Sequence, residues 1–100
     1  MVYDLKFEAE AFEEWRALDK SVREPLKKKL AKRLEHLHMP NQRLHGGLAA
    51  CYKIKNDKTG HRVVYQVLDE EMVVMVLAIE SRADLKAYRL ATERIERLND

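Results

Sequence analysis

The segment 72–79 is apolar at every position, and it constrains the fold of this chain more than any other feature. An unbroken apolar run of this length, bounded by acidic residues, is typical of a strand with both of its faces covered. Such a strand needs neighbouring strands and a layer of helices. The chain must therefore build a sheet around this segment.

Six more segments show the period of a strand or a helix. Residues 3–7 and 51–55 alternate, and with the run 61–68 they predict three further strands. Apolar residues at helical spacing predict two consecutive helices from about residue 8 to 37 and a third over about 82–98. Asp19 or Ser21 is expected to cap the second helix, and Ser81 the third.

The predicted order is β-α-α-β-β-β-α. It predicts an α+β fold, in which a small antiparallel sheet is flanked by an N-terminal hairpin of two antiparallel helices and by a C-terminal helix. A chain of 100 residues, 46 % of them apolar, can form one hydrophobic core. Because no linker or repeat interrupts it, we expect residues 1–100 to form a single domain.

The composition excludes several classes of protein. No apolar run approaches the ~20 residues that span a bilayer, and the acidic N-terminus does not resemble a secretory signal. We therefore expect a cytoplasmic protein with no membrane partner. The lone Cys51 excludes an internal disulfide and fits a reducing compartment. Because His36 and His38 are two residues apart and no second cysteine is present, neither a metal site nor a cofactor is expected.

The net charge of +2 hides a strongly basic middle. Residues 16–62 hold thirteen Lys or Arg and four acids, a net charge of +9, whereas the two flanks together carry −7. A block of this kind is either the solvated face of a helix or the footprint of a polyanion such as RNA.

Lys53, Lys55 and Arg62 are the most informative part of this basic block. Lys53 and Lys55 project from the same face of a strand, roughly 7 Å apart. Arg62 lies on the next strand of a tight hairpin and comes close to both if the register permits. Cations gathered on one sheet face repel each other, which points to a bound anion. The alternative is a solvated edge of the sheet.

Arg82 and Tyr88 could complete a site with these cations. Arg82 follows the last strand, and Tyr88 lies about two turns into the final helix, where a core position is the alternative. Cleavage of RNA without a metal needs a base for the 2′-hydroxyl, cations for the developing phosphorane charge and an acid for the leaving oxygen. Neighbouring positive charges favour the neutral amine of a lysine, so a Lys, Arg and Tyr set can supply all three. Such an enzyme would depend on another component to position its substrate.

Two stretches of the sequence stand out as motifs: Cys51-Tyr52-Lys53-Ile54-Lys55 and Gly60-His61-Arg62-Val63-Val64-Tyr65-Gln66-Val67. With these motifs the chain resembles the RelE toxins of bacterial and archaeal toxin–antitoxin pairs. The resemblance continues through Trp15-Arg16, Val22-Arg23-Glu24, Leu26-Lys27-Lys28-Lys29-Leu30, Arg82 and Tyr88. It implies a RelE/ParE-like fold, in agreement with the predicted order of elements.

The resemblance implies a metal-independent, ribosome-dependent endoribonuclease. Such an enzyme enters the vacant A site and cuts the mRNA codon there, which inhibits translation. The implied reaction is attack of the 2′-hydroxyl on the adjacent phosphate, leaving a 2′,3′-cyclic phosphate and a 5′-hydroxyl.

The same resemblance implies five catalytic residues: Lys53, Lys55, Arg62, Arg82 and Tyr88. Lys55 is the candidate base, with Tyr88 as its rival or assistant. Lys53 and Arg62 would stabilise the charge of the transition state, and Arg82 would assist the leaving oxygen.

Six other cations of the basic middle, together with one histidine, are the candidate contacts to RNA or the ribosome: Lys27, Lys28, Lys29, Lys32, Arg33, Arg43 and His61. His61 stands where family members often carry an aromatic residue. We therefore interpret it as a base-stacking or structural position, although a histidine can also carry a proton near pH 7.

The resemblance also implies a cognate RelB-like antitoxin, with operator DNA contacted only through that antitoxin. An acidic, partly disordered antitoxin tail would suit the basic middle of this chain. We expect the antitoxin either to cover the basic face or to displace the last helix, which would move Tyr88.

Two other functions stay open at this point. ParE toxins share the architecture but poison DNA gyrase through protein contacts and need no nuclease site. The third possibility is a binding module that holds ribosomal or other RNA without cutting it.

Overall fold

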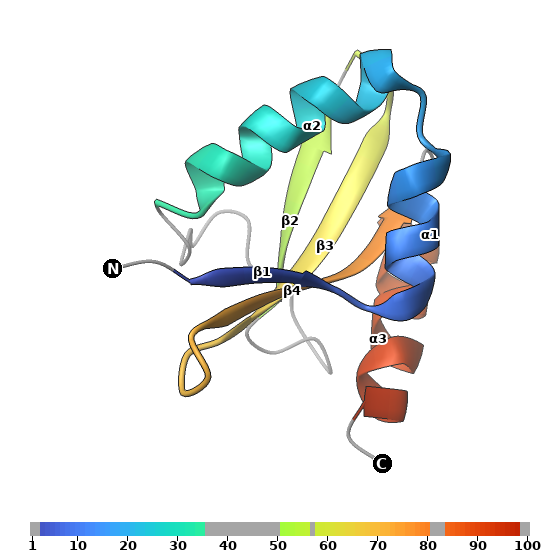
Figure 1. Cartoon of the computed structure of the whole chain (residues 1–100). Helices are drawn as coiled ribbons and strands as arrows, with labels where there is room; N and C mark the ends of the chain where they lie inside the picture. The colour runs from blue at the N-terminus through green and yellow to red at the C-terminus, as the bar shows by residue number, and fades with distance from the viewer. Residues whose placement is uncertain (1–2, 36–50, 57, 81–83, 99–100) are drawn as a thin grey trace.

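A computed structural model describes residues 3–35, 51–56, 58–80 and 84–98, apart from the side chains of residues 84–86 and 88. Within these ranges the predicted order of elements is confirmed (Figure 1). The elements are β1 (Asp4–Phe7), α1 (Ala9–Ala17), α2 (Lys20–Arg33), β2 (Cys51–Asn56), β3 (His61–Leu68), β4 (Val73–Glu80) and α3 (Asp84–Leu98). No helix in the described part of the chain is long and apolar enough to cross a membrane.

The four strands form one sheet in the order β1-β4-β3-β2. Strands β2, β3 and β4 are antiparallel to their neighbours, as predicted. Strand β1 instead pairs in parallel with β4, so the sheet is mixed and the expectation of a wholly antiparallel sheet was wrong for this strand. The long stretch of chain between β1 and β4 supplies the crossover that a parallel pair requires.

Strand β4 lies inside the sheet, between β1 and β3, and both of its faces are covered, as its apolar sequence predicts. The strand begins at Val73 and not at Met72, because Met72 has a φ of 54° and closes the turn before it. Its other end extends to Glu80, one residue beyond the apolar run.

A β-bulge interrupts the pairing of β3 with β4. Val64 lies opposite Ala78 and Tyr65 opposite Val76, so Leu77 is an extra residue in β4. Leu77 and Ala78 both pack in the cluster beneath α3, whereas Val76 and Ile79 pack on the other side of the sheet. The bulge therefore reverses the alternation of side chains along the last part of β4.

The sheet has two differently built faces. We call the side that packs against α1 and α2 the helix-pair face. Its buried residues form the larger core cluster: Ala11, Leu26, Leu30, Tyr52, Ile54, Val63, Tyr65, Val67, Val74, Val76 and Ile79. We call the other side the α3 face, whose smaller buried cluster contains Cys51, Val64, Leu77, Ala78, Ala87 and Ala91.

Helices α1 and α2 are consecutive but splayed. Asp19 accepts a hydrogen bond from the Ser21 amide at 3.1 Å, so Asp19 and not Ser21 is the N-cap of α2. From this corner α2 runs away from α1 and lies along β2, whereas α1 packs on β4 and β1 (Figure 1). The predicted helix pair is present, but its members cover separate parts of the sheet and do not lie side by side as an antiparallel hairpin.

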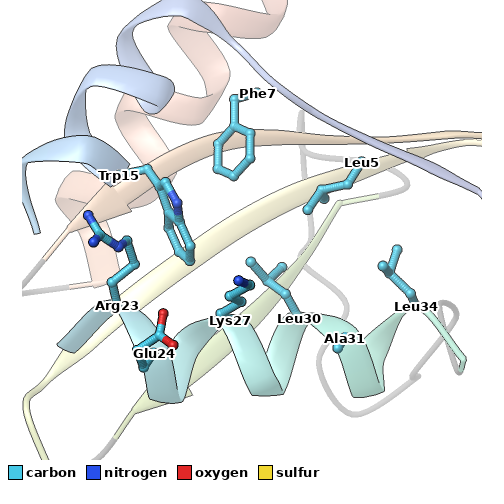
Figure 2. Close-up of a pocket in the computed structure, with 9 residues that line it drawn as sticks. All are labelled: Leu5, Phe7, Trp15, Arg23, Glu24, Lys27, Leu30, Ala31 and Leu34. Atoms are coloured by element: carbon cyan, nitrogen blue, oxygen red, sulfur yellow. The ribbon is translucent and has the colours of Figure 1, made fainter. Parts of the chain in front are cut away.

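An open groove of about 490 Å³ lies between β1, α1 and α2 on the helix-pair face (Figure 2). The Phe7 and Trp15 rings, with centroids 5.5 Å apart, form one side of it, and Leu30 and Leu34 of α2 form the other. Arg23, Glu24 and Lys27 lie at its α2 side. Apolar side chains thus remain accessible on the face that also holds the main core.

Arg94 fastens α3 to the edge of the sheet. Its Nη1 donates to the Leu77 carbonyl at 2.7 Å and to Glu14 Oε1 at 2.9 Å. The same Glu14 oxygen accepts a hydrogen bond from the Ile79 amide at 3.1 Å. Strand β1 ends before this part of β4, so two side chains replace a strand as partners for the open edge of β4.

Three acids of the N-terminal region surround the Arg94 guanidinium. The Arg94 side chain is only 3 % exposed and lies 3.6 Å from Glu8, 3.2 Å from Glu10 and 2.8 Å from Glu14. The hydrogen bond to Glu14 raises the pKa of the Arg94 guanidinium further, and the neighbouring Arg97 lowers the pKa of the Glu10 carboxyl. Sequence periodicity gave no indication of this cluster.

Candidate active site

Lys53, Lys55 and Arg62 lie together on the α3 face. The register of the β2–β3 hairpin places Lys55 directly opposite Arg62 and Lys53 opposite Val64. Lys53 and Lys55 alternate with the buried Tyr52 and Ile54, so both lysines point away from the main core. All three cations are half-buried. The expectation that the hairpin brings Arg62 next to Lys55 is confirmed.

The turn between β2 and β3 fixes this register. Gly60 has a φ of 77°, a conformation open to glycine without a steric cost, and its amide donates to the Asn56 carbonyl at 2.8 Å. Asn56 Oδ1 also accepts a hydrogen bond from the Lys58 amide at 3.2 Å. Arg62 Nη1 donates to the Gly60 carbonyl at 2.9 Å, so the turn also anchors one end of the Arg62 guanidinium.

Helix α3 covers only part of the face that carries these cations. Its small residues Ala87 and Ala91 are fully buried against Val64 and Ala78, and they allow a close approach of helix and sheet. The helix packs mainly on β4 and β3. Strand β2 lies at the edge of the sheet, beside this covered area, and therefore keeps Lys53 and Lys55 accessible.

Two of the predicted RNA contacts bind the edge strand of the sheet. Lys29 Nζ donates to the Lys55 carbonyl, and Arg33 Nη1 donates to the Lys53 carbonyl at 3.0 Å. Arg33 also donates to the Tyr65 hydroxyl at 3.2 Å and lies 5.9 Å from the centre of that ring. These side chains cover an open strand edge and attach α2 to the backbone of the two candidate catalytic lysines.

The other predicted contacts are placed as follows. Lys27, Lys28 and Lys32 are exposed on α2. His61 is half-buried at the start of β3, and its Nδ1 lies 2.8 Å from Thr59 Oγ1. Arg43 and Arg82 lie outside the described residues, and Tyr88 belongs to α3 with its side chain outside the description.

Near the site, burial is the main cause of the raised pKa values of the Cys51 thiol and the Tyr65 hydroxyl. Desolvation raises the pKa of the Cys51 thiol to about 12, so Cys51 is a packing residue and not a nucleophile. Burial also raises the pKa of the Tyr65 hydroxyl, and the hydrogen bond from Arg33 opposes that shift in part. Within the described ranges, no group of three His, Cys, Asp or Glu residues could hold a metal ion.

The arrangement suits the recognition of a phosphodiester. Two ammonium groups and a guanidinium share one accessible sheet face, and a phosphate can be bound by the planar fork of arginine and the point charge of lysine together. A lysine beside other cations can also exchange a proton with a hydroxyl group. The face can therefore both hold a scissile phosphate and take part in proton transfer.

One residue of this face was missed by the sequence reasoning. Glu80 is half-buried and lies directly opposite Arg62 on β4. Simple alternation from Val74 and Val76 would have placed it on the helix-pair face, and only the bulge at Leu77 brings it to the α3 face. A bulge of this kind leaves no clear signal in an all-apolar strand.

Comparison with known protein families gives a match over most of the chain. Residues 5–86 match the family described as the ParE toxin of the type II toxin–antitoxin system, parDE. The mRNA interferase toxin RelE of Escherichia coli K12 is 44 % identical over 95 residues, which is 95 % of this chain and 99 % of that protein.

Solved structures of RelE toxins are also similar to this chain. A doubly substituted E. coli toxin RelE in the free state has a TM-score of 0.85 and 44 % identity, and the match covers 95 % of this chain and 99 % of that one. The toxin in the intact E. coli RelBE toxin–antitoxin complex has a TM-score of 0.76 and 45 % identity, with 82 % and 98 % covered. The family match over residues 5–86 includes the strands that carry Lys53, Lys55 and Arg62.

Proposed function

The chain belongs to the RelE/ParE toxin family of type II toxin–antitoxin systems, and we propose that it acts as an mRNA-cleaving toxin that inhibits translation. The observation that carries this proposal is the cross-strand pair of Lys55 and Arg62, with Lys53 on the same accessible face. The relatives named as mRNA interferases match 95 % of the chain, which supports one toxin domain over residues 1–100.

The proposed reaction is a transesterification within the mRNA. The 2′-hydroxyl of one nucleotide loses its proton and attacks the adjacent phosphorus, and the bond to the 5′-oxygen of the next nucleotide breaks. The products are a 2′,3′-cyclic phosphate and a 5′-hydroxyl, which takes up a proton. The chemistry requires a base, an acid and cations around the phosphorane.

The individual roles are those that the resemblance to RelE toxins implies. Lys55 is the candidate base, with Tyr88 of α3 as its rival or assistant. Lys53 and Arg62 flank the place where a phosphate would sit against the sheet, so they would stabilise its developing negative charge. Arg82 would assist the departing 5′-oxygen.

The ribosome is the proposed source of substrate positioning. The candidate catalytic cations are only half-buried, and a partner that holds the mRNA in line would supply much of the rate at such a site. The exposed Lys27, Lys28 and Lys32 of α2 supply positive charge for ribosomal RNA around a vacant A site. Arg43 and His61 would add a further phosphate contact and a surface for base stacking.

A RelB-like antitoxin is the proposed partner in the cytoplasm. RelBE complexes have been solved for toxins that this chain resembles, including an E. coli RelE variant bound to an antitoxin peptide at 43 % identity and a TM-score of 0.77. Operator DNA would be reached only through the antitoxin. We expect this partner to cover the basic face or to displace α3 and so move Tyr88.

A gyrase-directed activity is the second candidate, because the family that matches residues 5–86 carries the ParE description. One experiment separates the two functions. The purified chain is added to ribosomes programmed with a defined mRNA and a vacant A site, to the same mRNA without ribosomes, and to a gyrase supercoiling reaction. We expect cleavage at the A-site codon only on the ribosome and no effect on gyrase. Intact mRNA together with inhibited supercoiling would replace the proposal with the second function.

A further inference from the structure

Glu80 is the one carboxylate that the described parts of β2, β3 and β4 place on the α3 face next to the candidate catalytic cations. Val74 and Val76 point to the helix-pair face, so regular alternation would send Glu80 there as well. The extra residue Leu77 shifts the phase, and the pairing of β3 with β4 sets Glu80 directly opposite Arg62.

Three strands thus contribute one charged residue each to a single row. Lys55 of β2 lies opposite Arg62 of β3, which lies opposite Glu80 of β4. Side chains paired in this way have Cβ atoms about 4.5–5.5 Å apart. Like charges in such a pair repel and opposite charges attract, so the repulsion between Lys55 and Arg62 is offset on the other side of Arg62.

The Arg62 guanidinium is also held by the turn that precedes β3. Its Nη1 donates to the Gly60 carbonyl at 2.9 Å, at the turn that joins β2 and β3. The same Nη1 donates to the His61 carbonyl at 3.4 Å. A long arginine side chain has many accessible rotamers, and hydrogen bonds from one nitrogen do not by themselves fix the plane of the guanidinium. A carboxylate on the neighbouring strand supplies a second, charge-assisted constraint.

We propose that Glu80 is a positioning residue for Arg62 in the cleavage reaction. Its carboxylate orients the guanidinium so that the N–H groups not used by the turn face the scissile phosphate. Glu80 does not itself contact the RNA in this role. The inference rests on the proposed nuclease function, because it assigns a task to Arg62 during phosphate cleavage.

The first test compares Glu80→Gln and Glu80→Ala in single-turnover cleavage on ribosomes with a vacant A site. At saturating toxin, we expect a rate about 10-fold lower for Glu80→Ala and an intermediate rate for Glu80→Gln, since an amide oxygen can still accept a hydrogen bond. The toxin concentration that gives half of the maximal rate should stay within about 2-fold, because positioning affects the transition state more than binding. Glu71→Ala, which removes an exposed acid from the β3–β4 turn, is the matched control and should match the unsubstituted chain.

The second test asks whether Glu80 acts through Arg62. In a double-mutant cycle, Glu80→Ala should slow the unsubstituted chain but have no further effect on Arg62→Ala. An equal loss in both backgrounds would overturn the proposal, and so would a change confined to the half-saturating concentration. If Glu80→Ala does not fold by circular dichroism, the same cycle with Glu80→Gln decides the question.

The nuclease function and the positioning role of Glu80 can be disproved separately. An unsubstituted chain that leaves ribosome-bound mRNA intact overturns the nuclease function and the role of Glu80 with it. Normal cleavage combined with additive effects of the two substitutions overturns the role of Glu80 alone.

Discussion

The two faces of the sheet use the same strands for different purposes. On the helix-pair face, β2 and β3 present Tyr52, Ile54, Val63 and Tyr65, all buried beneath two helices. On the α3 face the same strands present Cys51 and Val64 under the helix and then Lys53, Lys55 and Arg62 beyond it. Neighbouring residues of one strand therefore have different tasks, one in stability and the next in the proposed chemistry.

This contrast explains how so small a chain combines a stable fold with a crowded group of cations. The free energy of burial comes mainly from the helix-pair face, where two helices complete the core. The α3 face needs only small residues where the helix touches the sheet, and the rest of its area is left for charged side chains. Packing on the helix-pair face thus stabilises a sheet whose other face carries the candidate catalytic cations.

The largest effect is expected from the attachment of α3 to the sheet. Arg94→Met leaves the buried Glu8 and the half-buried Glu14 without this cation and removes the donor of the Leu77 carbonyl. Loss of one member of a buried ion pair costs about 4 kcal/mol of unfolding free energy. Urea denaturation measures this loss. Arg97→Met, which removes an exposed arginine of the same cluster, should lower the midpoint far less. Equal midpoints for the two variants would show that Arg94 does not hold α3 in place.

The next largest changes are expected from Ile54 and Lys53, two neighbours on β2 whose side chains point to opposite faces of the sheet. Ile54→Ala truncates a fully buried side chain and should cost about 3 kcal/mol of unfolding free energy, with cleavage by the remaining folded protein unchanged. Lys53→Met keeps a side chain of similar length and should leave stability within about 0.5 kcal/mol. It should slow cleavage on the ribosome by about 100-fold. The division between the faces is wrong if Lys53→Met unfolds the chain or cleaves at the normal rate.

A smaller change in stability should distinguish Arg33 from its neighbour Lys32 on α2. Arg33 bonds the Lys53 carbonyl and the Tyr65 hydroxyl, so Arg33→Met should lower the unfolding free energy by about 1–2 kcal/mol. Lys32 is exposed, and Lys32→Met should leave stability unchanged. The Lys32 variant should instead bind ribosomes more weakly and with a smaller dependence on salt, because one phosphate contact is lost. If the two variants behave identically in both assays, Arg33 and Lys32 do not differ in the way proposed, one in stability and the other in ribosome binding.

The smallest effect is a pH dependence that reports on the covered part of the α3 face. The pKa of the Cys51 thiol is raised to about 12 by burial, whereas its ordinary value is 9.0. In the folded chain the thiol therefore stays protonated at pH 9, and iodoacetamide should react slowly with it. The unfolded thiol loses its proton near pH 9, so the stability of the fold should decrease as the pH rises from there towards 12. Rapid alkylation of the native chain at pH 9 would mean that α3 does not cover Cys51.

Periodicity was sufficient to predict the elements and the candidate active face. The alternation of β2 and the glycine turn before β3 predict that Lys53, Lys55 and Arg62 share one face, and the register confirms it for Lys55 and Arg62. The apolar run of β4 predicts a strand with both faces covered, and its residues are buried on both sides of the sheet. In each case the signal is local, because it depends on residues close together in the sequence.

The features that were not predicted depend on contacts between distant parts of the chain. Nothing in residues 3–7 indicates a parallel pairing with β4. The link between Glu14 and Arg94 joins residues eighty positions apart. Likewise, the bulge at Leu77 changes which face Glu80 occupies without changing the composition of the strand. Sequence patterns specify which side of an element is buried, but they do not specify its partner.

The most direct test of the account is the single-turnover rate of mRNA cleavage on ribosomes with a vacant A site, combined with analysis of the new RNA ends. We predict a 2′,3′-cyclic phosphate and a 5′-hydroxyl at the A-site codon, with a rate about 100-fold or more lower for Arg62→Ala in a chain that is still folded. Uncut mRNA, or an Arg62→Ala variant that cleaves at the normal rate, would contradict the assignment of the α3 face as the active site.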